Sequence, residues 1–335
     1  MNDIDKLHLY AIQLAQEQES PNMVMTIEKE LLHYEILNAM DEGGLLDHLV
    51  FQGGTSLRLC YGAERYSEDL DFSGGRDFDR DGLETLGDCI THAVGNRYQV
   101  SVNVKNPRRE EGLVSAWTVI VNTTPSHKDI PQQRIKIEVA SIDSHDPVVL
   151  PLKVNYAGLG SYSDIMLPVE SRNEILADKI ESFVCSDHVR YRDLWDLSWL
   201  SKQPGIQPDK VRELRRWKAV DYGEVGRYAE KYPLIGEKLA NAFESDKFVQ
   251  EMSRFLPVSK VNRTIARALW LRGTRRQLEE LFADYPSDGT GRESGYHSNN
   301  AMESYPQASD AMLPYPDPSS DPGASTSTLN APGIA

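Results

Sequence analysis

The stretch that most constrains the fold of this 335-residue chain runs from residue 49 to residue 72. Leu49-Val50-Phe51 predicts a buried strand, which breaks at Gly53-Gly54 and restarts as a short helix at Thr55 or Ser56. Adjacent glycines let the backbone approach a ligand closely, and free amides at the start of a helix favour an anion. The stretch therefore predicts a strand–turn–helix unit that can cradle phosphate.

Two aspartates follow this unit on a second predicted strand. Asp69 and Asp71 are two residues apart, so both carboxylates project from one face of the strand while Leu70 and Phe72 face the core. Such a pair is tolerated where a divalent cation bridges it, and Mg²⁺ prefers a few carboxylates together with phosphate oxygens. An isolated Asp-x-Asp triplet is common at solvated strand ends. With the glycine turn and helix before it, the triplet predicts a metal site for handling nucleoside triphosphates.

A third carboxylate is expected from a neighbouring strand. Residues 132–140 alternate between apolar and polar side chains, which predicts a strand with its apolar face in the core. Glu138 lies on the opposite face, where it can serve as a second metal ligand or as a base for the attacking hydroxyl. The alternative is an ordinary exposed glutamate paired with Lys136 or Arg134.

Periodicity along the chain predicts an α+β fold, with a mixed β-sheet core flanked by helices and a C-terminal helical bundle region. We expect a core with N-terminal helices over residues 1–204, a helical region over 205–285 and a tail over 286–335. Helices are predicted at 5–18, 24–41, 80–95, 170–185, 190–201, 208–218, 224–230, 234–244, 246–255 and 260–283. Strands after the first two are predicted at 98–105, 114–122, 132–140 and 148–154.

Composition excludes several classes of protein. Hydrophobic residues make up 40% of the chain and charged residues 26%, as in a soluble globular protein. No apolar run approaches the roughly 20 residues of a membrane span, and the N-terminus lacks the features of a signal peptide. Cys60, Cys89 and Cys185 have no CxxC spacing, so neither a disulfide framework nor a zinc site is predicted. We expect a cytoplasmic protein with reduced thiols.

The tail, residues 286–335, differs from the rest of the chain. It holds seven of the 18 prolines, and six acidic residues against one arginine. Such a segment buries too little apolar surface to offset the entropy lost on ordering, so we expect it to be disordered.

Four segments follow one another in the order of motifs that belong to a single family. They are Gly53-Gly54-Thr55-Ser56-Leu57 with Arg65-x-Ser67-x-Asp69-x-Asp71-Phe72, then Ile135–Val139, Glu174–Ile180 and Arg190–Leu197. Together they resemble the AbiEii/AbiGii-type toxin nucleotidyltransferases, which belong to the DNA polymerase β-like superfamily and include the mycobacterial MenT toxins. The resemblance spans about residues 24–201 and implies a nucleotidyltransferase-type fold.

The resemblance also implies roles for individual residues. Asp69 and Asp71 would ligate Mg²⁺, and Glu138 stands where the superfamily more often has aspartate. The triphosphate would be held by Gly53, Gly54, Thr55, Ser56, Arg65 and Ser67.

The later motifs are expected to supply the rest of the site. Lys179 would neutralise phosphate charge, and either Asp193 or Asp196 would complete the site, since both lie in the fourth motif. Considered apart from the family resemblance, Lys179 is most simply a solvated helix lysine and Arg65 a surface charge.

A basic segment near the C-terminus contrasts with the formal net charge of −15, which argues against a general nucleic-acid coat. Residues 254–276 contain no acid, and Lys260, Arg263 and Arg267 are expected on one helical face near Trp270. The segment predicts an RNA-phosphate platform; the alternatives are a solvated basic face, or a contact for an acidic partner or for the chain's own tail. Its seven basic residues are Arg254, Lys260, Arg263, Arg267, Arg272, Arg275 and Arg276.

These features lead to one principal hypothesis and several alternatives. The principal one is a Mg²⁺-dependent, pyrophosphate-releasing nucleotidyltransferase toxin of a toxin–antitoxin or phage-defence pair, with a cognate antitoxin. By resemblance it would transfer a nucleotide from an NTP to the 3′ end of tRNA and block translation. The alternatives are a protein or small-molecule acceptor, kinase-like γ-phosphoryl transfer, or a non-catalytic nucleotide-binding partner. P-loop chemistry is not predicted, because no GxxxxGK[ST] occurs.

Overall fold

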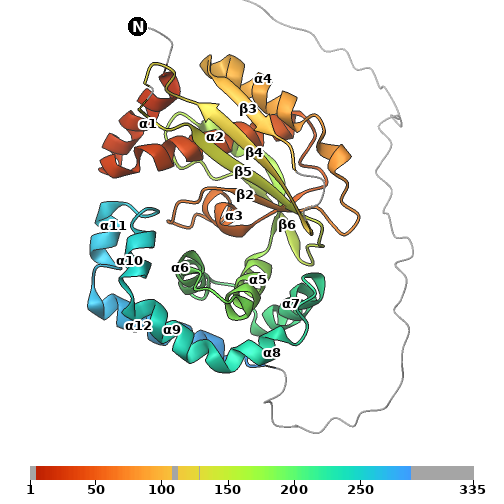
Figure 1. Ribbon diagram of the computed structural model, residues 1–335, viewed down its shortest axis with the longest axis vertical. Helices are drawn as coiled ribbons and strands as arrows, with labels where there is room; N and C mark the ends of the chain where they lie inside the picture. The colour runs from red at the N-terminus through yellow and green to blue at the C-terminus, as the bar shows by residue number, and fades with distance from the viewer. Residues whose placement is uncertain (1–4, 108–111, 128, 288–335) are drawn as a thin grey trace, which may run out of the picture. The chain divides into compact units, whose positions relative to one another are not determined.

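The computed structural model describes residues 5–107, 112–127 and 129–287. Within these residues seven strands form one mixed sheet in the order β3-β4-β5-β2-β1-β7-β6 (Figure 1). The predicted α+β class with a mixed sheet is confirmed. The strands are β1 Val50–Gln52, β2 Leu70–Ser73, β3 Ser101–Lys105, β4 Val114–Asn122, β5 Gln133–Ala140, β6 Pro147–Pro151 and β7 Met166–Glu170.

The centre of the sheet carries the residues that matter most for function. β2 is antiparallel to β1 and parallel to β5, with Asp71 opposite both Gln52 and Glu138. The alternate residues Phe51 and Phe72 are fully buried and their rings stack at a centroid distance of 5.1 Å. Because side chains alternate across a strand, this packing turns Asp71 and Glu138 to the opposite face.

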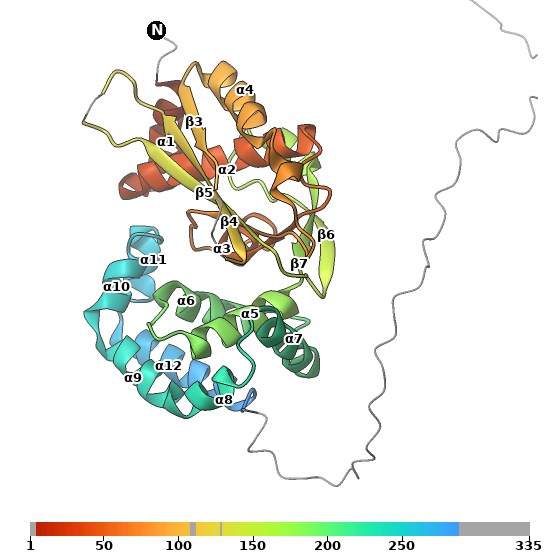
Figure 2. The same ribbon diagram turned by 45° about the vertical axis from the view of Figure 1, so that its right-hand side comes forward.

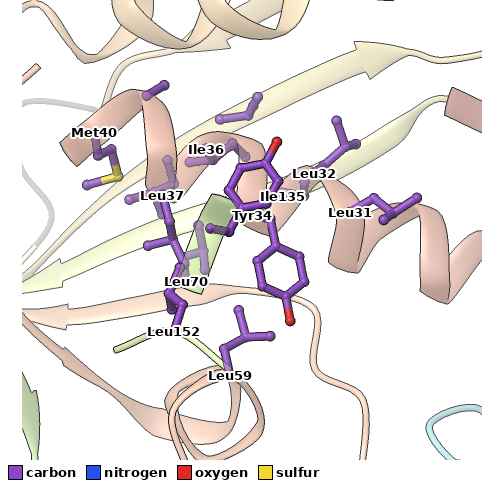
Figure 3. Packing of buried hydrophobic residues seen from close by; sticks show 14 of the residues in the cluster. Leu31, Leu32, Tyr34, Ile36, Leu37, Met40, Leu59, Leu70, Ile135 and Leu152 are labelled. Atoms are coloured by element: carbon purple, nitrogen blue, oxygen red, sulfur yellow. The ribbon is translucent and has the colours of Figure 1, made fainter. Parts of the chain in front are cut away.

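Three helices cover the core face of the sheet: α1 Lys6–Glu17, α2 Val24–Glu42 and α4 Leu86–Tyr98. Figure 3 shows the apolar side of α2, including Leu32 and Ile36, packed toward Ile135 and Leu70 of the sheet. These side chains are fully buried, so their burial stabilises the layer and sets the orientation of β2.

The helices from α5 onward form a second hydrophobic cluster, beyond the short helix α3 Gly53–Leu59 (Figures 1 and 2). Leu57 packs with this second cluster while Leu59 packs with the sheet, so α3 joins the two. The helices are α5 Arg172–Cys185, α6 Tyr191–Leu200, α7 Pro208–Asp221, α8 Arg227–Lys231, α9 Ile235–Glu244, α10 Asp246–Met252, α11 Val258–Arg263 and α12 Ala268–Ala283.

Several predicted elements need correction. α3 begins at Gly53 and not at Thr55 or Ser56. The helix predicted at 80–95 divides into a 3-10 turn, Arg80–Leu83, and α4. Strand β7 was not predicted, because Pro168 lies inside it and sequence patterns associate proline with strand ends.

The single helix predicted over 260–283 is also wrong. The chain leaves the helical conformation at Thr264, whose hydroxyl donates a 2.6 Å hydrogen bond to the carbonyl of Lys260. Ile265 is then fully buried, which requires a turn before α12 starts. α11 and α12 are therefore separate helices.

Two further predictions concern the tail and the absence of a membrane span. The disordered tail falls mainly on residues 288–335, which lie outside the described residues. None of the described helices has both the length and the hydropathy needed to cross a membrane.

Candidate active site

Three carboxylates meet on the face of the sheet turned away from α2. Asp71 and Glu138 are register partners in β2 and β5. Asp69 precedes β2 by one residue, and its Oδ1 accepts a 3.4 Å hydrogen bond from the backbone amide of Lys136. The structure thus brings together the three carboxylates that the sequence singled out.

The two aspartates of this group are partly buried beside other carboxylates, which disfavours their ionised forms. Burial, followed by the negative charges of Glu138 and Asp69, raises the pKa of Asp71 to about 7, and Lys179 offsets only part of this. Burial likewise raises the pKa of Asp69. A neighbouring cation would lower the pKa values of Asp69 and Asp71 and so favour their ionised forms.

Glu138 fits both interpretations offered by the sequence, that of an ordinary exposed glutamate and that of a functional group in the site. Its side chain is 33% exposed and lies 3.3 Å from Lys136 Nζ, as an ordinary surface glutamate would. It also lines the same cavity as Asp69 and Asp71. The ion pair is weak because both partners are accessible to water, so Glu138 is free to turn to a ligand.

The two glycines are required by close approaches. A Cβ atom at Gly53, where φ is +76°, would lie 2.6 Å from Oδ2 of Asp71. A Cβ at Gly54 would collide with the guanidinium of Arg65. Glycine alone therefore allows this turn to lie directly against the carboxylate and the arginine.

The three hydroxyl residues expected near the phosphate, Thr55, Ser56 and Ser67, differ in their surroundings. Thr55 Oγ1 donates to the carbonyl of Asp69, and Ser56 Oγ donates to the carbonyl of Gly53 at 2.9 Å. Both side chains are buried and do not line the cavity, whereas Ser67 does. Thr55 and Ser56 therefore fix the shape of the turn.

A buried ion network on α5 and α6 faces the carboxylates. Lys179 Nζ lies 2.8 Å from Asp193 Oδ1 and 2.9 Å from Asp196 Oδ2. Arg65 donates two hydrogen bonds to Asp196, at 2.8 and 2.7 Å. Lys179 and Arg65 are only 6% and 3% exposed, so their interpretation as surface charges is wrong.

In this network the neighbouring charges favour the ionised side chains, whereas on the sheet they disfavour them. Burial alone would raise the pKa of Asp196, but Arg65 and Lys179 outweigh it and lower the pKa to about 2. Burial also disfavours the Lys179 ammonium, yet Asp193 and Asp196 together raise its pKa. Lys179 and Asp196 are therefore both charged at neutral pH.

The structure separates the two candidate aspartates of the fourth motif. Asp193 lines the cavity, and its Oδ2 lies 2.7 Å from Nε of Arg190 in an ion pair without hydrogen-bond geometry. Asp196 lies behind it, 2% exposed, and does not line the cavity. Asp193 can therefore reach a ligand, while Asp196 holds Arg65 and Lys179.

A cavity of about 750 Å³ lies between the sheet and the helices, a size typical of small-molecule sites. Its sheet side and its helical side carry the groups described above. The lining includes Gly53, Gly54, Arg65, Ser67, Asp69, Asp71, Glu138, Lys179, Arg190, Arg192 and Asp193.

Sequence reasoning missed two arginines in this lining. Arg190 and Arg192 stand at the start of α6, and their side chains are 53% and 39% exposed. Among the described residues, the carboxylates nearest to Arg192 are those of Glu68 at 3.8 Å and Glu251 at 4.0 Å. The sequence could have indicated Arg190, because it lies three residues before Asp193 in the helix predicted over 190–201, and this spacing places two side chains on one helical face.

The basic segment, residues 254–276, is arranged differently from the prediction. Lys260 and Arg263 belong to α11, whereas Arg267 precedes α12, so the three do not share one helical face. Lys260 pairs with Glu64, and the two last arginines pair with glutamates of α9 and α12. Among the described residues, no carboxylate pairs with the exposed side chains of Arg254, Arg263, Arg267 and Arg272.

The donor set fits a divalent cation completed by substrate. Within the described part of the chain, no three His, Cys, Asp or Glu side chains are already arranged to hold a metal ion. Mg²⁺, however, usually takes one or two carboxylates and fills its other positions with water and phosphate oxygens. Asp69 and Asp71, whose pKa values are raised mainly by burial, are such a partial set.

Comparison with known proteins agrees with this architecture. The profile of one family, described as nucleotidyl transferase AbiEii toxin of type IV toxin–antitoxin systems, matches residues 35–285. The chain therefore belongs to the AbiEii nucleotidyltransferase toxins, and the family resemblance seen in the sequence is confirmed. Membership of this family implies a nucleotide substrate and an antitoxin partner.

Solved structures from two bacteria are among those that the chain matches. MenT4, a nucleotidyltransferase toxin from Mycobacterium tuberculosis H37Rv, is 18% identical with a TM-score of 0.52, over 82% of this chain and 89% of its own. JHP933 from Helicobacter pylori is 17% identical with a TM-score of 0.44, over 78% of this chain and 96% of its own. No curated protein matched the sequence. The likeness to MenT4 supports the fold alone.

Proposed function

We propose that the chain transfers a nucleotide from an NTP to an acceptor hydroxyl and releases pyrophosphate, with a divalent cation held by Asp69 and Asp71. One observation carries the proposal. The carboxylates on β2 and β5 repel one another without enough nearby positive charge to offset this, and they line the same cavity as Lys179 and Asp193.

The residues divide the work of the reaction. Asp69 and Asp71 would hold the cation, which supplies charge stabilisation for the phosphate oxygens when bound. Gly53 and Gly54 let the chain lie close to the triphosphate, and Ser67 offers it a hydroxyl. This is catalysis by positioning and by electrostatic stabilisation.

The bond changes follow from the class of reaction. The acceptor oxygen forms a bond to the α-phosphorus while the bond from that phosphorus to the pyrophosphate oxygen breaks. Glu138 accepts the proton of the attacking hydroxyl, since it is close to Asp71 and still reached by water.

Cations on the helical side would receive the triphosphate. Lys179 is fixed by Asp193 and Asp196 and acts as a positive charge held in place. Arg192 is accessible and lies no closer than 3.8 Å to its carboxylate neighbours among the described residues. Arg190 pairs with Asp193 at 2.7 Å but is half exposed, so both side chains can turn to the β- and γ-phosphates.

The acceptor is proposed to be RNA, with the 3′ end of tRNA as the attacked hydroxyl. The basic segment is attached to the site: the amide of Tyr66 donates to the carbonyl of Phe255 at 3.0 Å, and Arg192 lies over the Phe255 ring at 5.2 Å. The unpaired arginines beyond Phe255 offer sequence-independent contacts to phosphates. Modified tRNA would stop translation in the cytoplasm, which is an action suited to a toxin in phage defence and explains the need for an antitoxin.

An isotope experiment tests the whole proposal. Purified protein is incubated with Mg²⁺, each α-³²P-labelled NTP and total tRNA, alongside Asp69→Ala/Asp71→Ala and the exposed control Asp77→Asn. We expect label on tRNA, about a thousandfold less in the double variant, because the metal contributes several kcal/mol, and full activity in the control. Label on protein and not on tRNA would show that the acceptor is a protein. Absence of label from every acceptor would contradict nucleotide transfer.

A further inference from the structure

The cavity continues along α5 beyond the proposed phosphate site. Asp178, Ser182 and Ser186 line it at four-residue spacing, which places them along one face of the helix and its end. Ser186 is seven residues from Lys179, or about 10 Å at 1.5 Å per residue. The cavity therefore has room for a nucleoside beyond the phosphates.

A second wall of this extension comes from the end of α7 and the start of α8. Tyr222 Oη donates a 2.9 Å hydrogen bond to Asp178 Oδ1. Arg227 Nε donates to the carbonyl of Cys185 at 2.9 Å, and its Nη1 lies 3.3 Å from Glu224 Oε1. These contacts hold the two walls at a fixed separation. We call this part of the cavity, lined by Asp178, Ser182, Ser186, Tyr222, Glu224 and Arg227, the α7–α8 end.

The α7–α8 end rests on a buried ion cluster. Lys218, with no exposed surface, lies 2.6 Å from Glu170 Oε1 and 2.9 Å from Glu174 Oε1. Glu174 is one turn before Asp178 on α5, and Lys218 is one turn before Tyr222 on α7. Burying such a cluster adds little net stability, but it fixes the two helices so that Asp178 and Tyr222 are held in place before a ligand arrives.

The other end of the cavity leads to the basic segment. Arg192 and Glu251 line it there, and Arg192 contacts Phe255 at the start of that segment. In both Figure 1 and Figure 2, α10 and α11 lie on the opposite side of α5 and α6 from α7. An acceptor bound to the basic segment enters from this side, which leaves the α7–α8 end for the donor.

We infer that the α7–α8 end holds the nucleoside of the NTP, and that Asp178 and Glu224 select a base with an exocyclic amino group. This inference rests on the proposed nucleotidyltransferase function. Ionised carboxylates only accept hydrogen bonds. Among the described residues, no partner engages Asp178 Oδ2 or Glu224 Oε2, so each has an oxygen available.

The chemistry of the four bases then predicts an order of preference. Adenine, cytosine and guanine each carry an exocyclic amino donor, whereas uracil carries none and has its O4 carbonyl oxygen where cytosine has the amino group. A carboxylate facing a carbonyl is repulsive. We therefore expect UTP to bind roughly tenfold more weakly than the best of the other three nucleotides, the discrimination typical of one base-edge contact.

Binding of unreactive nucleotides tests the inference. Affinities of the full chain for α,β-methylene analogues of ATP, CTP, GTP and UTP are measured by calorimetry with Mg²⁺. Glu224→Gln gives the wall an amide donor that can pair with uracil, so the disadvantage of UTP should shrink about tenfold. Asp178→Asn, which still accepts from Tyr222, should act in the same direction. Glu230→Gln, an exposed change on α8, serves as the matched control and should leave the order unchanged.

The outcomes distinguish the inference from the function on which it rests. Equal binding of all four nucleotides, or an order unchanged in both variants, overturns base selection at the α7–α8 end while nucleotide binding stands. Absence of binding to every nucleotide overturns the proposed function, and the inference with it.

Discussion

The two halves of the candidate site treat the same kind of residue in opposite ways. On the sheet, burial and neighbouring carboxylates raise the pKa of Asp71 to about 7. On α6, Arg65 and Lys179 overcome burial and lower the pKa of Asp196 to about 2. In the sheet half the nearby positive charges do not offset burial of the aspartates, whereas in the helical half they do.

This difference indicates what each half does. A group of carboxylates whose repulsion is unrelieved gains most from a bound cation. The helical half gains nothing by rearranging, because Lys179 and Arg65 already have two and one carboxylate partners. We therefore expect the sheet half to bind the cation and the helical half to provide a fixed frame beside it.

The largest expected effect comes from breaking the frame. Asp196→Ala removes the carboxylate that pairs with the buried guanidinium of Arg65 and one of the two that pair with Lys179, and removing one partner of such a buried network costs about 3–5 kcal/mol. The measurement is urea unfolding of the variant and of wild type. Glu280→Ala, which breaks only an exposed pair with Arg276, is the control and should unfold close to wild type.

Asp193 provides the matched comparison within the same helix. Asp193→Ala leaves Lys179 paired with Asp196, so it should lose much less stability than Asp196→Ala. It should nevertheless lose nucleotide transfer, because Asp193 lines the cavity. Equal destabilisation by the two variants would contradict the division of roles between them.

A smaller effect is expected on the sheet half, and it depends on pH. The folded pKa of Asp71 is raised, so the folded state binds a proton that the unfolded chain has released between about pH 4 and pH 7. Stability from this group is complete below pH 4 and is lost as the pH rises toward 7, at up to about 1.4 kcal/mol per pH unit. Asp71→Asn removes this dependence.

Unfolding of metal-free protein at pH 5, 6 and 7 measures this effect as the difference between wild type and Asp71→Asn. The variant should become the more stable of the two as the pH rises, even though it is inactive. The exposed change Asp77→Asn should leave the pH slope of wild type unchanged. A constant difference at all three pH values would show that Asp71 is not perturbed.

Sequence predicted the sheet half far better than the helical half. Strand alternation decides which face Asp71 and Glu138 occupy, and the Gly53-Gly54 turn follows from local backbone geometry, so short-range rules were sufficient. Burial of Arg65 against Asp196 joins residues 131 positions apart, and no periodicity records such a contact. The prediction of one continuous helix over 260–283 was wrong for a related reason, since burial of Ile265 by distant helices overrode a continuous helical pattern.

The smallest effect is expected in the basic segment, where paired and unpaired arginines repeat the contrast between the two halves. Arg263→Glu/Arg267→Glu reverses two exposed charges that no described carboxylate engages, so tRNA binding should weaken severalfold and its salt dependence should become shallower. Arg275→Glu/Arg276→Glu, the matched control, reverses two arginines already paired with glutamates, so its effect should be smaller. Filter binding at two salt concentrations measures both, and affinity for an NTP analogue should stay unchanged because neither pair lines the cavity. Equal losses in the two variants would mean that tRNA responds only to net charge, and unchanged affinity in both would remove the basic segment from the acceptor site.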